Sequence, residues 1–188
     1  MKKLVVLFTA FVLFTLNQAF AYRAADFSSD AKIIAAINLL EQTGEVDVLR
    51  NLKKNAVQVS FDDLTSYTYN ASKAFAVSTY NRYGTRIIMI NSLYRNAPVE
   101  QIACLVAHES MHVKRVADLE EETIATQKEA ATWTRLKVAS KAYPDTKLTR
   151  RLDKLSGMYM ASSNGNNIIQ KCTCWTNCMF SSTGKYAC

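Results

Sequence analysis

The chain has 188 residues, of which 49% are hydrophobic and 21% charged, with only five Gly and two Pro. This composition excludes a largely disordered or collagen-like chain, and the length suits one domain with a hydrophobic core. The net charge of +7 is spread along the chain, and its densest basic stretch, residues 147–154, lacks the aromatic or Gly-rich neighbours of a nucleic-acid site. We therefore expect a solvated helix face there and no nucleic-acid partner.

Residues 1–21 have the organisation of a secretory signal peptide. Two lysines precede a largely apolar run from Leu4 to Leu16, and Ala19-Phe20-Ala21 follows as a small-x-small cleavage site. A membrane anchor is the alternative, but the run is shorter than the roughly 20 residues that span a bilayer. We expect a secreted or periplasmic protein that begins near Tyr22 and keeps no stable membrane anchor.

Helices and then strands are predicted next. Asp30 can cap a helix that ends at Thr43-Gly44, and a second short helix covers residues 46–55. The alternation of apolar and polar residues from Val57 to Phe61 predicts a half-buried strand. Residues 73–80 and 86–91, on either side of a turn at residues 81–84, predict an antiparallel hairpin.

The chain then becomes helical. Residues 99–107 are apolar nearly all round, which predicts a buried helix after Pro98. Asp118 and Glu121 form a capping box for a further helix that is expected to reach about Ala142, and a last helix spans residues 148–160. We therefore predict an α+β domain over residues 22–161, with a small antiparallel sheet packed on the buried helix.

Residues 162–188 are predicted to form a polar linker and a cysteine-rich tail. In an exported protein, four clustered cysteines favour two disulfides, with three possible pairings. A small zinc site is the alternative, although the spacings do not match the usual CxxC knuckle. The four residues are Cys172, Cys174, Cys178 and Cys188.

His108-Glu109-Ser110-Met111-His112 fits the pattern H-E-x-x-H and falls on the buried helix. Residues at i and i+4 share a helix face, so both imidazoles can bind one Zn²⁺. Zn²⁺ lowers the pKa of its bound water to about 7, and Glu109 can take the proton of that water. The chain has only these two histidines, and an unpaired His-Glu-His set would be costly to bury.

A catalytic zinc site needs a third protein ligand, and no His is left to supply it. Asp118 and Glu121 are suited to capping, whereas Glu122 lies on the face that carries the large apolar residues of its helix. We therefore favour Glu122 as the ligand, with Glu121 and Asp118 as alternatives. The residues that share the face of Glu122 are Ala125, Glu129, Trp133 and Leu136.

Two further residues lie near this constellation. Glu129 follows Glu122 by seven positions, and it is predicted to support a ligand or to pair with a lysine. Cys104 precedes His108 by one helical turn. We expect Cys104 to be a small buried hydrophobic residue, with a fourth ligand that silences the site as the alternative.

The stretch from Arg86 to Leu136 resembles the zincin metallopeptidases, nearest their small Glu-ligand (gluzincin-like) branch. Besides H-E-x-x-H, the resemblance rests on Glu122-Thr-Ile-Ala125, which matches the E-x-x-A element that often supplies the third ligand in that branch. It implies a minimal zincin-like domain with a second ligand helix, and an edge strand at residues 87–90 that aligns a peptide substrate. It also implies a side chain that stabilises the oxyanion. The candidates are Tyr94, Tyr143, Tyr159 and Arg82.

The residues and the resemblance together predict a secreted zinc-dependent metallopeptidase. Zn²⁺ is held by His108, His112 and Glu122, and Glu109 activates a zinc-bound water that attacks a peptide bond. The predicted partner is a peptide or protein substrate, and the sequence indicates no oligomeric state. The alternatives are a non-enzymatic exported zinc-binding protein, which would have a closed coordination shell, and a zinc hydrolase that acts on a cell-wall amide.

Overall fold

The computed structural model describes residues 23–66 and 73–161. The predicted signal peptide and the four cysteines of the tail, with their predicted disulfides, lie outside these residues. Within them the fold is α+β, with five α-helices, a three-stranded sheet and short 3₁₀ turns. None of the described helices is both long and apolar enough to cross a membrane.

The N-terminal part packs two helices over the rest of the core. After a 3₁₀ turn, η1 (Ala24–Asp26), helix α2 (Ala31–Gln42) begins at Asp30, whose carboxylate accepts hydrogen bonds from the N–H groups that follow it. Gly44 has a φ of +76°, a conformation that favours glycine, and it turns the chain into α3 (Val46–Lys54). The cap at Asp30 and both helices agree with the prediction.

The sheet is mixed, so the predicted all-antiparallel sheet is wrong. Its strands are β1 (Gln58–Asp62), β2 (Ala76–Tyr80) and β3 (Arg86–Asn91), in the order β1-β3-β2. The hairpin β2/β3 is antiparallel as predicted, but β1 pairs with β3 in parallel. The alternation in β1 identifies a strand but carries no information about the direction of its partner.

The central place of β3 also overturns the expectation that residues 87–90 form an edge strand. β3 is hydrogen-bonded on both sides and largely buried, so it has no free edge for a substrate. The edges of the sheet are β1 and β2. The amide of Val59 in β1 donates to the carbonyl of Phe27, which covers part of that outer edge.

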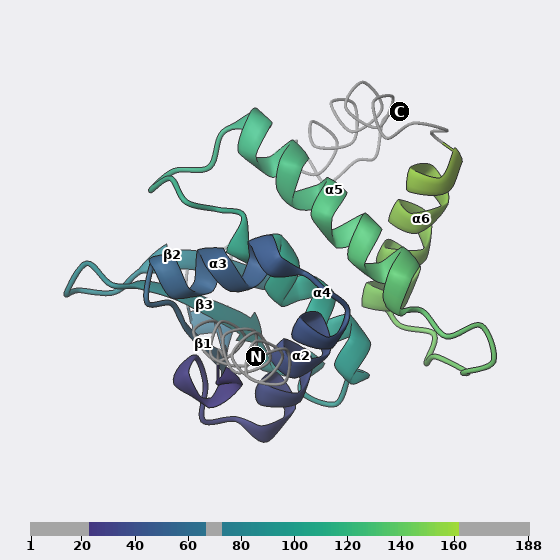
Figure 1. Ribbon diagram of the computed structural model, residues 1–188, viewed down its shortest axis with the longest axis horizontal. Helices are drawn as coiled ribbons and strands as arrows, with labels where there is room; N and C mark the ends of the chain where they lie inside the picture. Colours follow the sequence, from purple (N-terminus) through teal and green to yellow (C-terminus); the bar gives the residue numbers. More distant parts are fainter. Residues whose placement is uncertain (1–22, 67–72, 162–188) are drawn as a thin grey trace, which may run out of the picture.

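Helix α4 (Val99–Ser110) follows a 3₁₀ turn, η4 (Ser92–Tyr94), and forms the centre of the molecule. Every residue from Gln101 to Ser110 is buried, as predicted for a helix that is apolar nearly all round. Helix α4 contacts α2 and the sheet on one side and α5 on the other (Figure 1).

Helices α5 (Leu119–Leu136) and α6 (Lys147–Ala161) pack against each other on the far side of α4 (Figure 1). The end of α5 at Leu136 corrects the predicted end near Ala142. Lys137 is extended, and the chain folds back so that Tyr143 packs edge-on against the buried Trp133 with ring centroids 4.9 Å apart. This contact covers the ring of Trp133, and the helix has therefore already ended before Pro144.

An ion network around a buried carboxylate ties α5 to the turn between α2 and α3. Glu45 is almost fully buried, and its carboxylate lies 3.2 Å from Lys128 Nζ and 2.5 Å from an Arg135 nitrogen. Thr132 adds a hydroxyl contact to the same carboxylate at 3.3 Å. Because all three partners lie on α5, the network fixes the position of that helix relative to the N-terminal helices.

Candidate metal centre

The H-E-x-x-H motif lies at the C-terminal end of α4, and its last residue is outside the regular helix. Helix α4 ends at Ser110, so the expectation that both histidines are helical holds only for His108. The N–H groups of Met111 and His112 donate to the carbonyls three residues earlier, at 3.0 and 3.3 Å, which is the tighter 3₁₀ pattern of many helix ends. The two imidazoles still meet, with ring centroids 5.2 Å apart.

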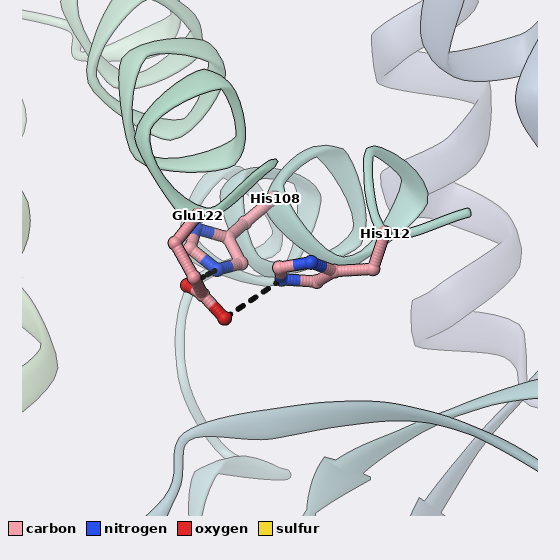
Figure 2. Close-up of side chains that lie close together, drawn as sticks. All are labelled: His108, His112 and Glu122. Atoms are coloured by element: carbon pink, nitrogen blue, oxygen red, sulfur yellow. Dashed lines mark ion pairs between the residues drawn. The ribbon is translucent and has the colours of Figure 1, made fainter. Parts of the chain in front are cut away.

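Glu122 lies opposite the two histidines (Figure 2). Its Oε2 is 3.8 Å from His108 Nε2, and its Oε1 is 3.7 Å from His112 Nε2. One donor atom from each of the three residues lies within 4.8 Å of the others. Among the described residues, the structure therefore brings together the three side chains that the sequence singled out as metal ligands.

The two alternative acids lie elsewhere. Asp118 caps α5 by accepting the N–H of Glu121 at 2.9 Å, and it pairs with Lys114 in a short contact at the surface. The carboxylate of Glu121 does not serve the capping box, which corrects the prediction. It accepts the N–H groups of Val113 and Lys114 at 2.8 and 3.0 Å, because the loop after α4 folds over the first turn of α5.

Each imidazole also faces a second carboxylate of α5 through its Nδ1 atom. Glu129 Oε2 is 3.0 Å from His108 Nδ1, and Glu121 Oε2 is 3.5 Å from His112 Nδ1. In the observed ring orientations, neither Nδ1 atom has a hydrogen-bond partner of good geometry among the described residues. Each Nδ1 is therefore in close contact with a carboxylate but not hydrogen-bonded to it. Glu129 thus contacts His108, one of the predicted ligands, and its cationic partner is Arg151 and not the predicted lysine.

Arg151 was missed because it lies in the basic stretch that was predicted to be a solvated face. Its neighbour Arg150 fits that prediction, with 60% of its side chain exposed, whereas only 9% of the Arg151 side chain is exposed. The spacing does contain a signal. Arg151 shares a face with the buried leucines at positions 148, 152 and 155, which is the inward face of α6.

Arg86 is a second buried cation that sequence reasoning missed. Its Nε donates to Ser78 Oγ at 2.9 Å, and its guanidinium donates to the carbonyl of Glu109 in a short contact. It thereby attaches the end of α4 to the hairpin β2/β3. Its alternation with Ile88 and Ile90, both fully buried, was the available signal that it points inward.

The electrostatics of the site follow from burial and from its several carboxylates. Burial raises the pKa of Glu109 to about 7, and a protonated His108 opposes this shift. Burial lowers the pKa of His112, which favours the neutral imidazole that binds metals. Burial also acts to lower the pKa of His108, but the carboxylate of Glu129 outweighs it and the net shift is upward. Burial acts to raise the pKa of Glu129, but Arg151 and His108 together outweigh it and lower that pKa to about 2.

The three facing groups fit Zn²⁺. Their separations of 3.7 and 3.8 Å are too long for hydrogen bonds, so these largely buried groups do not satisfy one another. Two ligands of a tetrahedral Zn²⁺ with bonds near 2.0–2.1 Å lie about 3.4 Å apart, so the three donor atoms, which lie within 4.8 Å of one another, would move closer together around one ion. Two imidazole nitrogens and one carboxylate oxygen are also a known donor set of catalytic zinc sites.

Cys104 and most of the oxyanion candidates have other surroundings. Cys104 belongs to the hydrophobic core, and burial raises the pKa of its thiol well above the usual value, so the expected packing role fits it. Tyr143 packs on Trp133, and Tyr94 packs on Phe75 with centroids 5.1 Å apart. Arg82 stacks on the ring of its neighbour Tyr83.

Comparison with known proteins finds no relative of this chain. No family model matches the chain, and it matches no curated protein and no solved structure. The resemblance to zincins therefore depends on the sequence motifs alone.

Proposed function

We propose that the protein is an extracytoplasmic zinc-dependent metallopeptidase in which His108, His112 and Glu122 hold Zn²⁺ and Glu109 is the general base. One observation carries the proposal: two Nε2 atoms face one carboxylate, while each Nδ1 faces another carboxylate of α5. A carboxylate at Nδ1 favours a proton there and leaves the Nε2 lone pair free for a metal.

Glu109 is placed and tuned for proton transfer in such a site. Its Oε2 lies 4.0 Å from His112 Nε2, on the side of the ring that faces Glu122. Burial raises the pKa of Glu109 to about 7 in the metal-free site, and a bound cation would favour the ionised carboxylate that a general base requires. A bound Zn²⁺ would supply Lewis acidity and lower the pKa of water. Glu109 would then take the proton of the attacking water and deliver it to the leaving amine.

A polypeptide substrate is favoured by the sheet edge beside the site. β2 pairs with β3 on one side, and among the described residues no backbone hydrogen bond covers its other side. The hydroxyl of Tyr80, at the end of β2, donates to the carbonyl of Val113, the residue directly after His112. An extended peptide could therefore add to β2 next to the proposed zinc ligands. In this proposal β2 takes the role first expected of residues 87–90.

The proposal is tested with the mature chain and two variants of its site. Zinc content is measured after dialysis, and hydrolysis is measured on a mixed peptide library with and without a chelator. Wild type should bind one zinc ion and cleave peptides only without the chelator. Glu109→Gln should keep the metal and lose about 10²–10⁴-fold in rate, because the general base is removed. Glu122→Ala should lose the metal, whereas Glu120→Ala, a change at the exposed neighbouring acid, should alter neither quantity.

Three results would count against the proposal. Cleavage by Glu109→Gln at the wild-type rate would refute the assigned base. Tight zinc binding without hydrolysis of any peptide would favour the zinc-binding protein without enzymatic activity. Hydrolysis of cell-wall amides without hydrolysis of peptides would move the substrate to that class.

A further inference from the structure

We propose that Arg151 of α6 is a positioning residue for the zinc site: it fixes the carboxylate of Glu129, which in turn fixes the imidazole of His108. This inference rests on the proposed zinc site and extends it to a third helix. Arg151 belongs neither to H-E-x-x-H nor to the E-x-x-A element, and it is not one of the three side chains that could hold the ion.

The three side chains form a continuous line of contacts from α6 through α5 to α4. Arg151 donates two hydrogen bonds to Glu129, from Nε to Oε1 at 3.0 Å and from Nη2 to Oε2 at 2.8 Å. The same Oε2 lies 3.0 Å from His108 Nδ1. Only 1% of the Glu129 side chain is exposed, so water has little access to the carboxylate that joins the other two groups.

This geometry explains how a residue of α6 can act on a ligand of α4. A two-point contact between an arginine and a carboxylate fixes the plane of the carboxylate as well as its position. Without the arginine, Glu129 would be a buried charge that has lost its main cation, and it would turn or take up a proton. The contact at Nδ1 aims the opposite nitrogen of the ring, Nε2, at Glu122.

Helix α6 has other attachments, so the effect of Arg151 can be separated from the docking of the helix. Asp153 accepts the indole N–H of Trp133 at 2.8 Å, and the hydroxyls of Ser156 and Thr134 lie 2.8 Å apart. Three leucines of α6 are also buried in the interface with the rest of the protein. Replacing the guanidinium should therefore leave α6 in place and release the carboxylate of Glu129.

The test uses the mature chain with its cysteine tail and the variants Arg151→Met, Arg151→Lys and Glu129→Gln. Arg150→Met is the matched control, because Arg150 is the adjacent arginine on the exposed face of the same helix. The Kd for Zn²⁺ is measured by competition with a chromogenic chelator, and the unfolding of the metal-free protein is measured in urea. The absorption spectrum of bound Co²⁺ reports the geometry around the ion.

We expect Arg151→Met and Glu129→Gln each to weaken Zn²⁺ binding about 10–100-fold and to change the Co²⁺ spectrum, with Arg150→Met unchanged. Arg151→Lys should recover part of the affinity, because it keeps the charge but not the two-point contact. The double variant Arg151→Met/Glu129→Gln should be weakened less than the product of the single effects, since both act through one contact.

The inference is overturned if Arg151→Met is less stable to urea but its folded form binds Zn²⁺ with the wild-type Kd and spectrum. If Arg151→Met does not fold, the comparison of Glu129→Gln and Arg151→Lys with wild type decides in the same way. A wild-type protein that binds no Zn²⁺ would overturn the proposed function and this inference together. Binding by wild type with no change in the variants would overturn this inference alone.

Discussion

Glu121→Ala should be one of the most damaging single changes in the loop between the two ligand helices. The carboxylate of Glu121 accepts two backbone N–H groups, from Val113 at 2.8 Å and Lys114 at 3.0 Å. Hydrogen bonds to a charged group contribute roughly 1.5–3 kcal/mol each, so the metal-free protein should lose about 3 kcal/mol of unfolding free energy. Asp118→Ala removes one helix cap at the surface and should therefore cost less than Glu121→Ala.

The measurement is urea unfolding of the metal-free protein, followed by circular dichroism, for Glu121→Ala, Asp118→Ala and the exposed control Glu120→Ala. A titration with Zn²⁺ follows, because Glu121 Oε2 also lies 3.5 Å from His112 Nδ1 and its loss should weaken binding at least tenfold. The reasoning is refuted if Glu121→Ala is no less stable than Asp118→Ala and binds Zn²⁺ like wild type.

Two further predictions concern ionisation. Below pH 4.5 Glu109 is neutral in both the folded and the unfolded metal-free protein, and between pH 4.5 and its folded pKa of about 7 the wild type should lose about 3 kcal/mol of unfolding free energy relative to Glu109→Gln. A pH-independent difference in urea stability would contradict this. Cys104, whose pKa burial raises, should resist alkylation in the native protein and react after unfolding. Mass spectrometry of its peptide checks this, and labelling of the native protein at the rate of a free thiol would show that the thiol is accessible.

The elements that local patterns define were largely predictable from the sequence. The cap at Asp30 and the turn before β3 involve residues close in sequence, so their chemistry can be read directly. The direction of β1 relative to its partner could not be predicted, because it depends on which strand of the hairpin β1 lies beside. Next to β3 it is parallel, as in the pairing of Gln58 with Ile87. The early end of α5 could not be read either, because it depends on a contact between Trp133 and Tyr143.

The candidate site likewise has residues that local spacing predicts and contacts that it does not. His108, His112 and Glu122 follow from spacing on two helices, and the structure brings them together. Of their supporting groups, Glu129 follows from the helical period of α5, and the spacing of Arg151 from the buried leucines indicates that it faces inward. The pairing of Arg151 with Glu129 could not be predicted, because it depends on how α5 and α6 pack against each other.

The order of strands in the sheet has a consequence for how the chain folds. The hairpin β2/β3 joins segments that are neighbours along the chain, so it can form early. β1 comes before both, yet among the described residues its partner strand is β3, the second strand of that hairpin. During synthesis from the N-terminus, β1 therefore has no partner strand on its β3 side until residues 86–91 have emerged. Closure of this parallel pair has the higher contact order, which places it on the slow side of folding.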